Sequence, residues 1–109
     1  MAITAVGPIN VAEGYPGGAS AALNVTAAAV LKAAPGVCVR ISVITAGSAG
    51  TLAINDCTTT GAAATANQFY NGLNASLTQG AVVELDWPCG SGITVSAVPT
   101  GSVLAIAFT

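Results

Sequence analysis

The apolar residues of this chain recur at every second position in several short segments, and this pattern constrains the fold more than any other feature. It runs through residues 37–43, 81–87, 93–97 and 103–108. Because side chains at alternate positions share one face of a β-strand, each segment predicts a strand. In 103–108 both faces are apolar, which predicts a strand that is central in its sheet or covered on both sides.

Turn-forming residues separate these segments. Shorter strands are predicted at 51–55 and 68–70, the latter closed by the turn dipeptide Asn71-Gly72. Pro88 is expected to end the strand that begins at 81, because proline cannot donate to a strand ladder. Many short strands with regular turn signals predict an all-β fold, a single β-sandwich or a small barrel.

Residues 21–34 fit two interpretations. Leu23, Ala27, Val30 and Leu31 have helical spacing, with Ser20 as a possible N-cap. The β-branched residues in the same stretch favour strands instead, and a strand pair turning at Pro35-Gly36 also fits.

The first twenty residues differ from the rest and are predicted to be an extended N-terminal arm, with the β-domain at 21–109. Glycines and prolines are too frequent here for a regular element. The arm nonetheless carries apolar residues that are costly to leave in water, so we expect it to lie on a neighbouring surface in an assembly. Its interface candidates are Ile3, Val6, Ile9, Val11 and Tyr15.

Charge is scarce: 6% of the residues are charged and 53% are hydrophobic, with a net charge of -2. Lys32 and Arg40 are the only cations, too few for phosphate neutralisation, so neither a nucleic-acid nor a membrane partner is expected. No apolar run approaches the length of a membrane span, and the first ten residues lack the basic start of a signal peptide. These features predict a soluble protein, made in the cytoplasm, whose charge-poor surface is covered by protein partners.

The residues for catalysis are sparse. The chain has no histidine, which excludes Ser-His-Asp and Cys-His arrangements, and it has no phosphate-binding loop. Glu84 and Asp86 could act as paired carboxylates, but they are better interpreted as a solvated or intersubunit face, with Lys32 and Arg40 as their partners. We therefore expect no enzyme activity, no cofactor and no metal site. Trp87 is expected either in the core or as an interface anchor.

Three cysteines, Cys38, Cys57 and Cys89, occur without a Cys-x-x-Cys pair. We expect them to be buried reduced thiols, with Cys38 on a strand face. Cys57 and Cys89 each close a strand before a loop and could lie near each other; a bridge between them is the alternative.

The order of these strands and turns resembles a class of small tailed-phage virion proteins, the head decoration or cement proteins. The resemblance covers about residues 21–109, a span read from the strand pattern. It is carried by residues 30–37 leading into the strand at 40–43, by Asn55-Asp56-Cys57, by 85–89 and by the closing apolar strand. In that pattern Lys-x-x-Pro-Gly closes a strand, which favours strands over a helix in 28–33.

The resemblance implies a jelly-roll or related sandwich on the outer surface of a capsid. Its partners would be the major capsid protein and copies of the chain itself, a trimer being expected before a dimer. The nearest alternatives are a tail-associated protein and a host- or glycan-binding module, such as a head fibre. In a glycan-binding module Trp87, Tyr70, Asn67 and Gln68 would contact the sugar.

Overall fold

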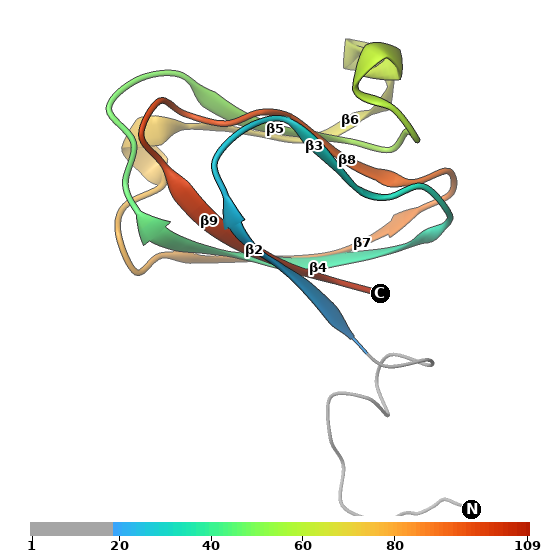
Figure 1. The fold of residues 1–109 in the computed structure, drawn as a ribbon, viewed down its shortest axis with the longest axis horizontal. Coiled ribbons are helices and arrows are strands. Elements are labelled where there is room, and N and C mark those ends of the chain that lie inside the picture. Colours follow the sequence, from blue (N-terminus) through green and yellow to red (C-terminus); the bar gives the residue numbers. More distant parts are fainter. Residues whose placement is uncertain (1–18) are drawn as a thin grey trace, which may run out of the picture.

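The computed structural model of the chain describes residues 19–109, which form a sandwich of two antiparallel sheets (Figure 1). The described strands are β2 (Ser20–Val25), β3 (Ala29–Lys32), β4 (Gly36–Thr45), β5 (Thr51–Asn55), β6 (Gln68–Leu73), β7 (Val82–Cys89), β8 (Ile93–Ala97) and β9 (Val103–Phe108). Three short 3-10 helices, η1 (Thr60–Ala62), η2 (Thr65–Asn67) and η3 (Asn74–Ser76), lie in the connections. The predicted all-β sandwich is confirmed.

One sheet has the order β2-β9-β4-β7 and the other β3-β8-β5-β6. Consecutive strands lie in opposite sheets along the whole described chain, except that β5 and β6 are neighbours in the same sheet. This is the connectivity of a jelly roll, eight strands wound as two Greek keys. Residues 21–34 form strands β2 and β3 rather than a helix.

The predicted strand pair turning at Pro35-Gly36 needs correction. β3 and β4 flank Pro35 but do not pair, because β3 joins β8 and β4 joins β7 and β9. The chain crosses from one sheet to the other here. The arm's predicted contacts, those of Ile3, Val6, Ile9, Val11 and Tyr15, lie outside the described residues.

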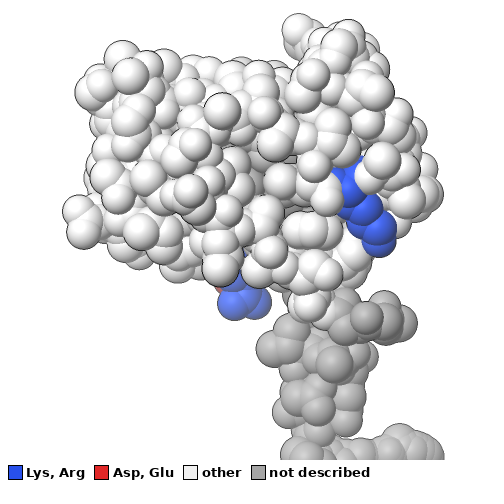
Figure 2. All heavy atoms as spheres, in the orientation of Figure 1, with Lys and Arg blue, Asp and Glu red and all other residues white. Residues whose placement is uncertain are grey.

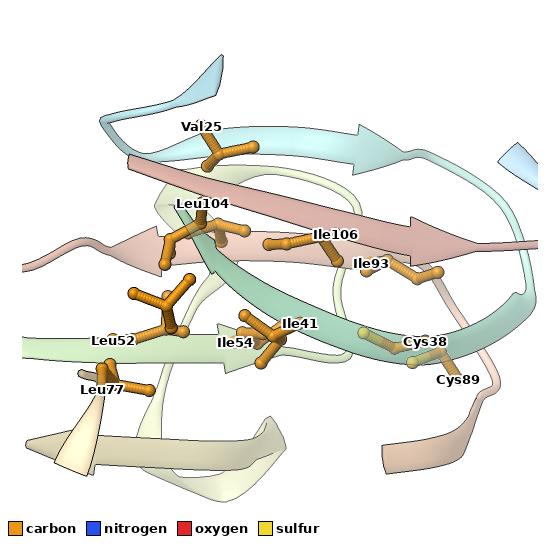
Figure 3. Packing of buried hydrophobic residues seen from close by; sticks show 12 residues of the cluster. Val25, Cys38, Ile41, Leu52, Ile54, Leu77, Cys89, Ile93, Leu104 and Ile106 are labelled. Carbon is orange, nitrogen blue, oxygen red and sulfur yellow. The ribbon is translucent and has the colours of Figure 1, made fainter. Parts of the chain in front are cut away.

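The core lies between the sheets and consists mainly of branched aliphatic side chains (Figure 3). Ile41 and Val43 of β4 and Leu104 and Ile106 of β9 face it, in register with each other, and all four are almost completely buried. The predicted alternation is confirmed in β9. In β4 it holds only from Arg40 onward, because the register shift between Cys38 and Arg40 brings Cys38 instead of Val39 into the core cluster. β9 is central, between β2 and β4, which accounts for its two apolar faces.

The sequence predicts a turn at Asn71-Gly72, but strand β6 continues through both residues to Leu73. A Cβ on Gly72 would come within 2.5 Å of the Tyr70 hydroxyl, so the tyrosine occupies the space beside the glycine. Tyr70 and Gly72 lie two positions apart on one strand and therefore share a face. The tyrosine ring covers the glycine, which would otherwise weaken an edge strand. A turn dipeptide is therefore accommodated inside a strand.

Pro88 does not end its strand either, since β7 continues to Cys89 with Pro88 opposite Val37. β7 is the edge strand of its sheet, where a residue without an N–H is tolerated because one side of the strand has no neighbour. A bulge opposite Val39 precedes the proline, and there Asp86 adopts a left-handed φ of 47°. The edge is thus interrupted twice, which discourages strand pairing with other chains.

The three cysteines are free and buried, as predicted. Cys38 and Cys89 lie side by side in the core, a pairing that the sequence did not predict (Figure 3). Burial, together with the electrostatic effect of the neighbouring Cys89 thiol, raises the pKa of Cys38 to about 12. Burial and the nearby charge of Asp56 raise the pKa of Cys89 to about 11.

We expect none of the three thiols to react with iodoacetamide at pH 8 in the folded protein. The thiolate is the nucleophile, and both burial and the raised pKa values of Cys38 and Cys89 suppress it. Intact-mass spectrometry should show no adduct on the native chain and three adducts after unfolding in guanidinium. Rapid alkylation of the native protein at all three sites would contradict the burial of the thiols.

Candidate functional site

The outer surface of sheet β2-β9-β4-β7 carries mainly aliphatic side chains. Its residues alternate with those that enter the core: Ala107 lies opposite Arg40, Ala105 opposite Ser42, and Arg40 and Ser42 lie opposite Glu84 and Val82. We call it the apolar face. It comprises Ala21, Leu23, Arg40, Ser42, Ile44, Thr45, Val82, Glu84, Val103, Ala105 and Ala107.

Three large aliphatic side chains of the apolar face are well exposed. Leu23 is 73% exposed, Val82 56% and Ile44 52%. Between the outer strands, β9 presents small side chains such as Ala105 and Ala107. A contiguous apolar surface of this kind marks a contact site more often than a free surface.

The charges on the apolar face are one cation and one anion. The Nε of Arg40 lies 3.5 Å from Oε2 of Glu84, across the β4–β7 pair. Both side chains are about half exposed, so the pair contributes little to stability on its own. In Figure 2 the two blue patches, the chain's two cations, lie apart on an otherwise almost uncharged surface.

The predicted charged cluster is therefore only partly assembled. Arg40 and Glu84 meet, as expected, but Lys32 ends β3 in the other sheet, where its side chain lies beside Gly36. Asp86 is exposed at the bulge of β7. The separation follows from the sandwich, because β3 and β4 belong to different layers.

Trp87 lies at the open edge of the sandwich rather than deep in the core. Its ring stacks on Phe69 of β6, with centroids 5.9 Å apart and an angle of 4° between the planes. β6 and β7 are edge strands of opposite sheets, so the stacked pair closes the gap between the layers. The ring stays 48% exposed, because it has packing on one side only.

Leu23, Ile44 and Val82 were not recognised as interface candidates from the sequence. Val82 carried a signal, because it is apolar at a position that alternates with the inward-facing residues of β7. Ile44 follows a register shift in β4, and β2 had no firm secondary-structure assignment, so neither Ile44 nor Leu23 could be placed on a face.

A second feature is a clamp between two loops, centred on Asp56. Its carboxylate accepts backbone N–H bonds from Gly90 (2.9 Å), Ser91 (2.8 Å) and Gly92 (3.1 Å). Partial burial opposes ionisation, but the three donors outweigh it and hold the pKa of Asp56 below its ordinary value of 3.8. The clamp ties the end of β5 to the turn before β8.

We expect the Asp56 clamp to make stability fall at low pH. A carboxyl whose pKa is lower in the folded state stabilises the fold above its unfolded pKa, and this contribution is lost as the pH falls through the folded pKa. Urea unfolding of the wild type and of Asp56→Asn should therefore differ at pH 7 and converge as the pH falls well below the ordinary value of 3.8. An equal difference at both pH values would contradict the role of the charge.

A third feature is a polar hollow of about 310 Å³ between the outer surface of sheet β3-β8-β5-β6 and the loop that carries η1 and η2. Its lining includes Asn55, Thr60, Thr65, Gln68 and Ser96. Asn55 and Ser96 are bonded to each other, so their polar atoms already have partners inside the protein. Of the residues named for sugar contact, only Gln68 lines this hollow; Trp87 and Tyr70 belong to the sandwich edge.

Within residues 19–109 no group of three or more His, Cys, Asp or Glu side chains is placed to hold a metal ion. The described helices are too short for any of them to cross a membrane. The chain matches no protein-family model, no curated protein and no solved structure.

Proposed function

We propose that this protein is a structural virion protein, a bacteriophage capsid decoration or cement protein that binds the outer head surface and stabilises it. The observation that supports this most directly is the apolar face, with Leu23, Ile44 and Val82 exposed in a charge-poor surface. Such a face is suited to close packing against protein, because small side chains at its centre allow a partner to approach.

The proposed partners are the major capsid protein and copies of the chain itself, with no nucleic acid and no membrane. Jelly rolls occur in capsid proteins and in lectins, so the connectivity is compatible with this function by analogy only. We propose no enzyme activity for this chain. It would be synthesised in the host cytoplasm and would act on the outer capsid surface by contact alone.

The test is to look for the chain in purified particles. Virions from cultures of the source organism, banded on a density gradient, would be analysed by intact-mass spectrometry for the 10.4 kDa chain and imaged by cryo-electron microscopy. Intact mass is preferable to tryptic digestion, because cleavage is limited to Lys32 and Arg40. We expect the chain at many copies per particle on the outer head surface; its absence from banded particles would contradict the proposal.

A host- or glycan-binding module is the second candidate, favoured by the polar hollow beside η1 and η2. Hydroxyl and amide groups such as those of Thr60, Thr65 and Gln68 are the donors and acceptors that sugars require. A glycan array separates the two functions, since a decoration protein should bind no sugar on it. Reproducible binding that is lost in Gln68→Ala would favour the second candidate.

A further inference from the structure

We propose that Cys38 and Cys89 form a modification site, a pair of thiols that a low-molecular-weight disulfide such as oxidised glutathione converts into a disulfide bridge between β4 and β7. Both thiols are free in this structure. The proposed function does not require the bridge, so the bridge is a separate property of the chain.

The register of β4 and β7 places the two cysteines diagonally across one strand pair. Cys38 lies opposite Trp87 and Cys89 lies opposite Gly36, so the two thiols are two positions apart along the ladder. Both side chains belong to the core cluster and are almost completely buried. They therefore share the inward face of neighbouring strands, which is the first requirement for a bridge.

The sulfur of Cys89 is turned toward Cys38. Its thiol donates to the carbonyl oxygen of Trp87 (3.8 Å), the residue that pairs with Cys38. Burial and Asp56 raise the pKa of Cys89, and a hydrogen bond from the backbone N–H of Cys38 partly opposes them. Figure 3 shows the two sulfur atoms next to each other. No other side chain of the described core separates them in this view.

Closing the bridge requires a small movement of β7. Diagonal partners on neighbouring strands have Cα atoms ~7–8 Å apart, whereas a disulfide needs at most about 7 Å. β7 can move because it is an edge strand with a bulge opposite Val39 and a proline next to Cys89. In turn, the bridge would hold the end of β7 to β4 at the point where Pro88 cannot donate a ladder hydrogen bond.

Cys57 provides an internal comparison. It is also buried, but it does not belong to the core cluster that contains the other two cysteines. Its thiol donates to the carbonyl oxygen of Thr59 (3.3 Å), in the loop after β5. We therefore expect Cys57 to stay a free thiol when Cys38 and Cys89 are bridged.

The oxidation consists of two thiol–disulfide exchanges. The thiolate of one cysteine attacks oxidised glutathione, whose S–S bond breaks, and one reduced glutathione leaves as a mixed disulfide forms. The thiolate of the other cysteine then attacks the protein sulfur of the mixed disulfide and releases the second glutathione. The cysteines lose two electrons and two protons, and one oxidised glutathione becomes two reduced ones.

The exchange has to take place while the end of β7 is open. Burial suppresses the thiolates of Cys38 and Cys89 in the folded chain and also keeps the oxidant away from them. During folding, or during local opening of the edge strand, both thiols are exposed to the oxidant. The test therefore supplies the oxidant while the chain folds.

The full chain is refolded from guanidinium in a buffer with an excess of oxidised over reduced glutathione. Free thiols are then blocked with N-ethylmaleimide in denaturant, and the chain is digested with trypsin without reduction. Cleavage after Lys32 and Arg40 separates residues 33–40, which carry Cys38, from residues 41–109, which carry Cys57 and Cys89. We expect mass spectrometry to find the two fragments joined, with the maleimide on Cys57.

A matched pair of alanine variants identifies the partner of Cys38. Cys57→Ala should leave the two tryptic fragments joined, whereas Cys89→Ala should release them. Circular dichroism checks that both variants are folded.

The bridge should also stabilise the wild type, because it closes a loop of roughly 50 residues in the unfolded chain. The oxidised chain should unfold at a urea concentration at least about 1 M above that of the reduced chain. Dithiothreitol should abolish the difference.

Three results would overturn the bridge: a refolded wild type with three blocked thiols, fragments that stay joined in Cys89→Ala, or an oxidised chain no more stable than the reduced one. None of these measurements involves a virion. A chain absent from virions would overturn the capsid role alone, and an unbridged chain found in virions would overturn the disulfide alone.

Discussion

Replacing Gly92 with alanine is expected to lower the free energy of unfolding by about 3 kcal/mol, from overpacking and backbone strain. A Cβ at this position would lie 2.5 Å from the carbonyl oxygen of Cys57 and 2.7 Å from that of Lys32. Lys32 ends strand β3, and the carbonyl oxygen of Cys57 accepts a hydrogen bond from the buried Thr94 hydroxyl (2.8 Å), so neither atom can yield cheaply. The N–H of Gly92 also donates to Asp56, and a shift of the turn would weaken that clamp. Urea unfolding followed by circular dichroism measures the change.

Gly61 provides the matched control. It lies in η1, where a Cβ would meet nothing within 4 Å, and its backbone is not in the left-handed region. Gly61→Ala should therefore change stability by less than about 0.5 kcal/mol, as surface substitutions do. If both alanines were equally harmless, the close approach of the backbone at Gly92 would not be a constraint on this fold.

A core strand could be predicted most clearly where its burial alternates from one residue to the next. β9 shows this best: Leu104 and Ile106 enter the core while Ala105 and Ala107 face outward, and the pattern in the sequence is the pattern in the structure. The choice between helix and strand in 21–34 was harder. β2 and β3 are edge strands with register shifts, so their apolar residues do not keep period two.

Local turn signals failed where tertiary contacts replaced them. The Asn71-Gly72 dipeptide is extended, because Ile54 pairs with Tyr70 and Leu52 with Gly72, which keeps the whole segment in the sheet. Pairing with a buried neighbouring strand outweighs the intrinsic preference of two residues. Such pairings join residues far apart in the sequence, so the residues around the dipeptide do not indicate them.

Of the candidate interaction surface, the sequence could indicate the charged pair but not the face around it. Arg40 and Glu84 stood out as two of very few charges. Recognising that they share a face with Leu23 requires the sheet order, since β9 lies between β2 and β4. The order of strands in a jelly roll is set by long-range pairing, so the apolar face becomes visible only in three dimensions.

A buried amide holds the loop that carries η1 and η2 against its sheet. Asn55 of β5 is 1% exposed, and its Nδ2 donates to the backbone oxygen of Ala64 (2.9 Å) and to Oδ1 of Asn67 (2.7 Å). Its Oδ1 accepts a bond from the Ser96 hydroxyl (2.6 Å). These contacts connect two strands with the loop. They could not be predicted from the sequence, because an asparagine at a strand end resembles a turn residue.

Asn55→Ala is therefore expected to lower the free energy of unfolding by about 2–3 kcal/mol, because the partners in the loop and on β8 lose their bonds where water has little access. Hydrogen exchange should also become faster in residues 58–67 than in the core strands. Asn71→Ala is the matched control: Asn71 donates to Gln68 on the protein surface, where water replaces a lost bond, so its removal should cost less than about 0.5 kcal/mol. If the two alanine variants unfolded at the same urea concentration, the loop would not depend on Asn55, and the polar hollow would have to be held by the short helices alone.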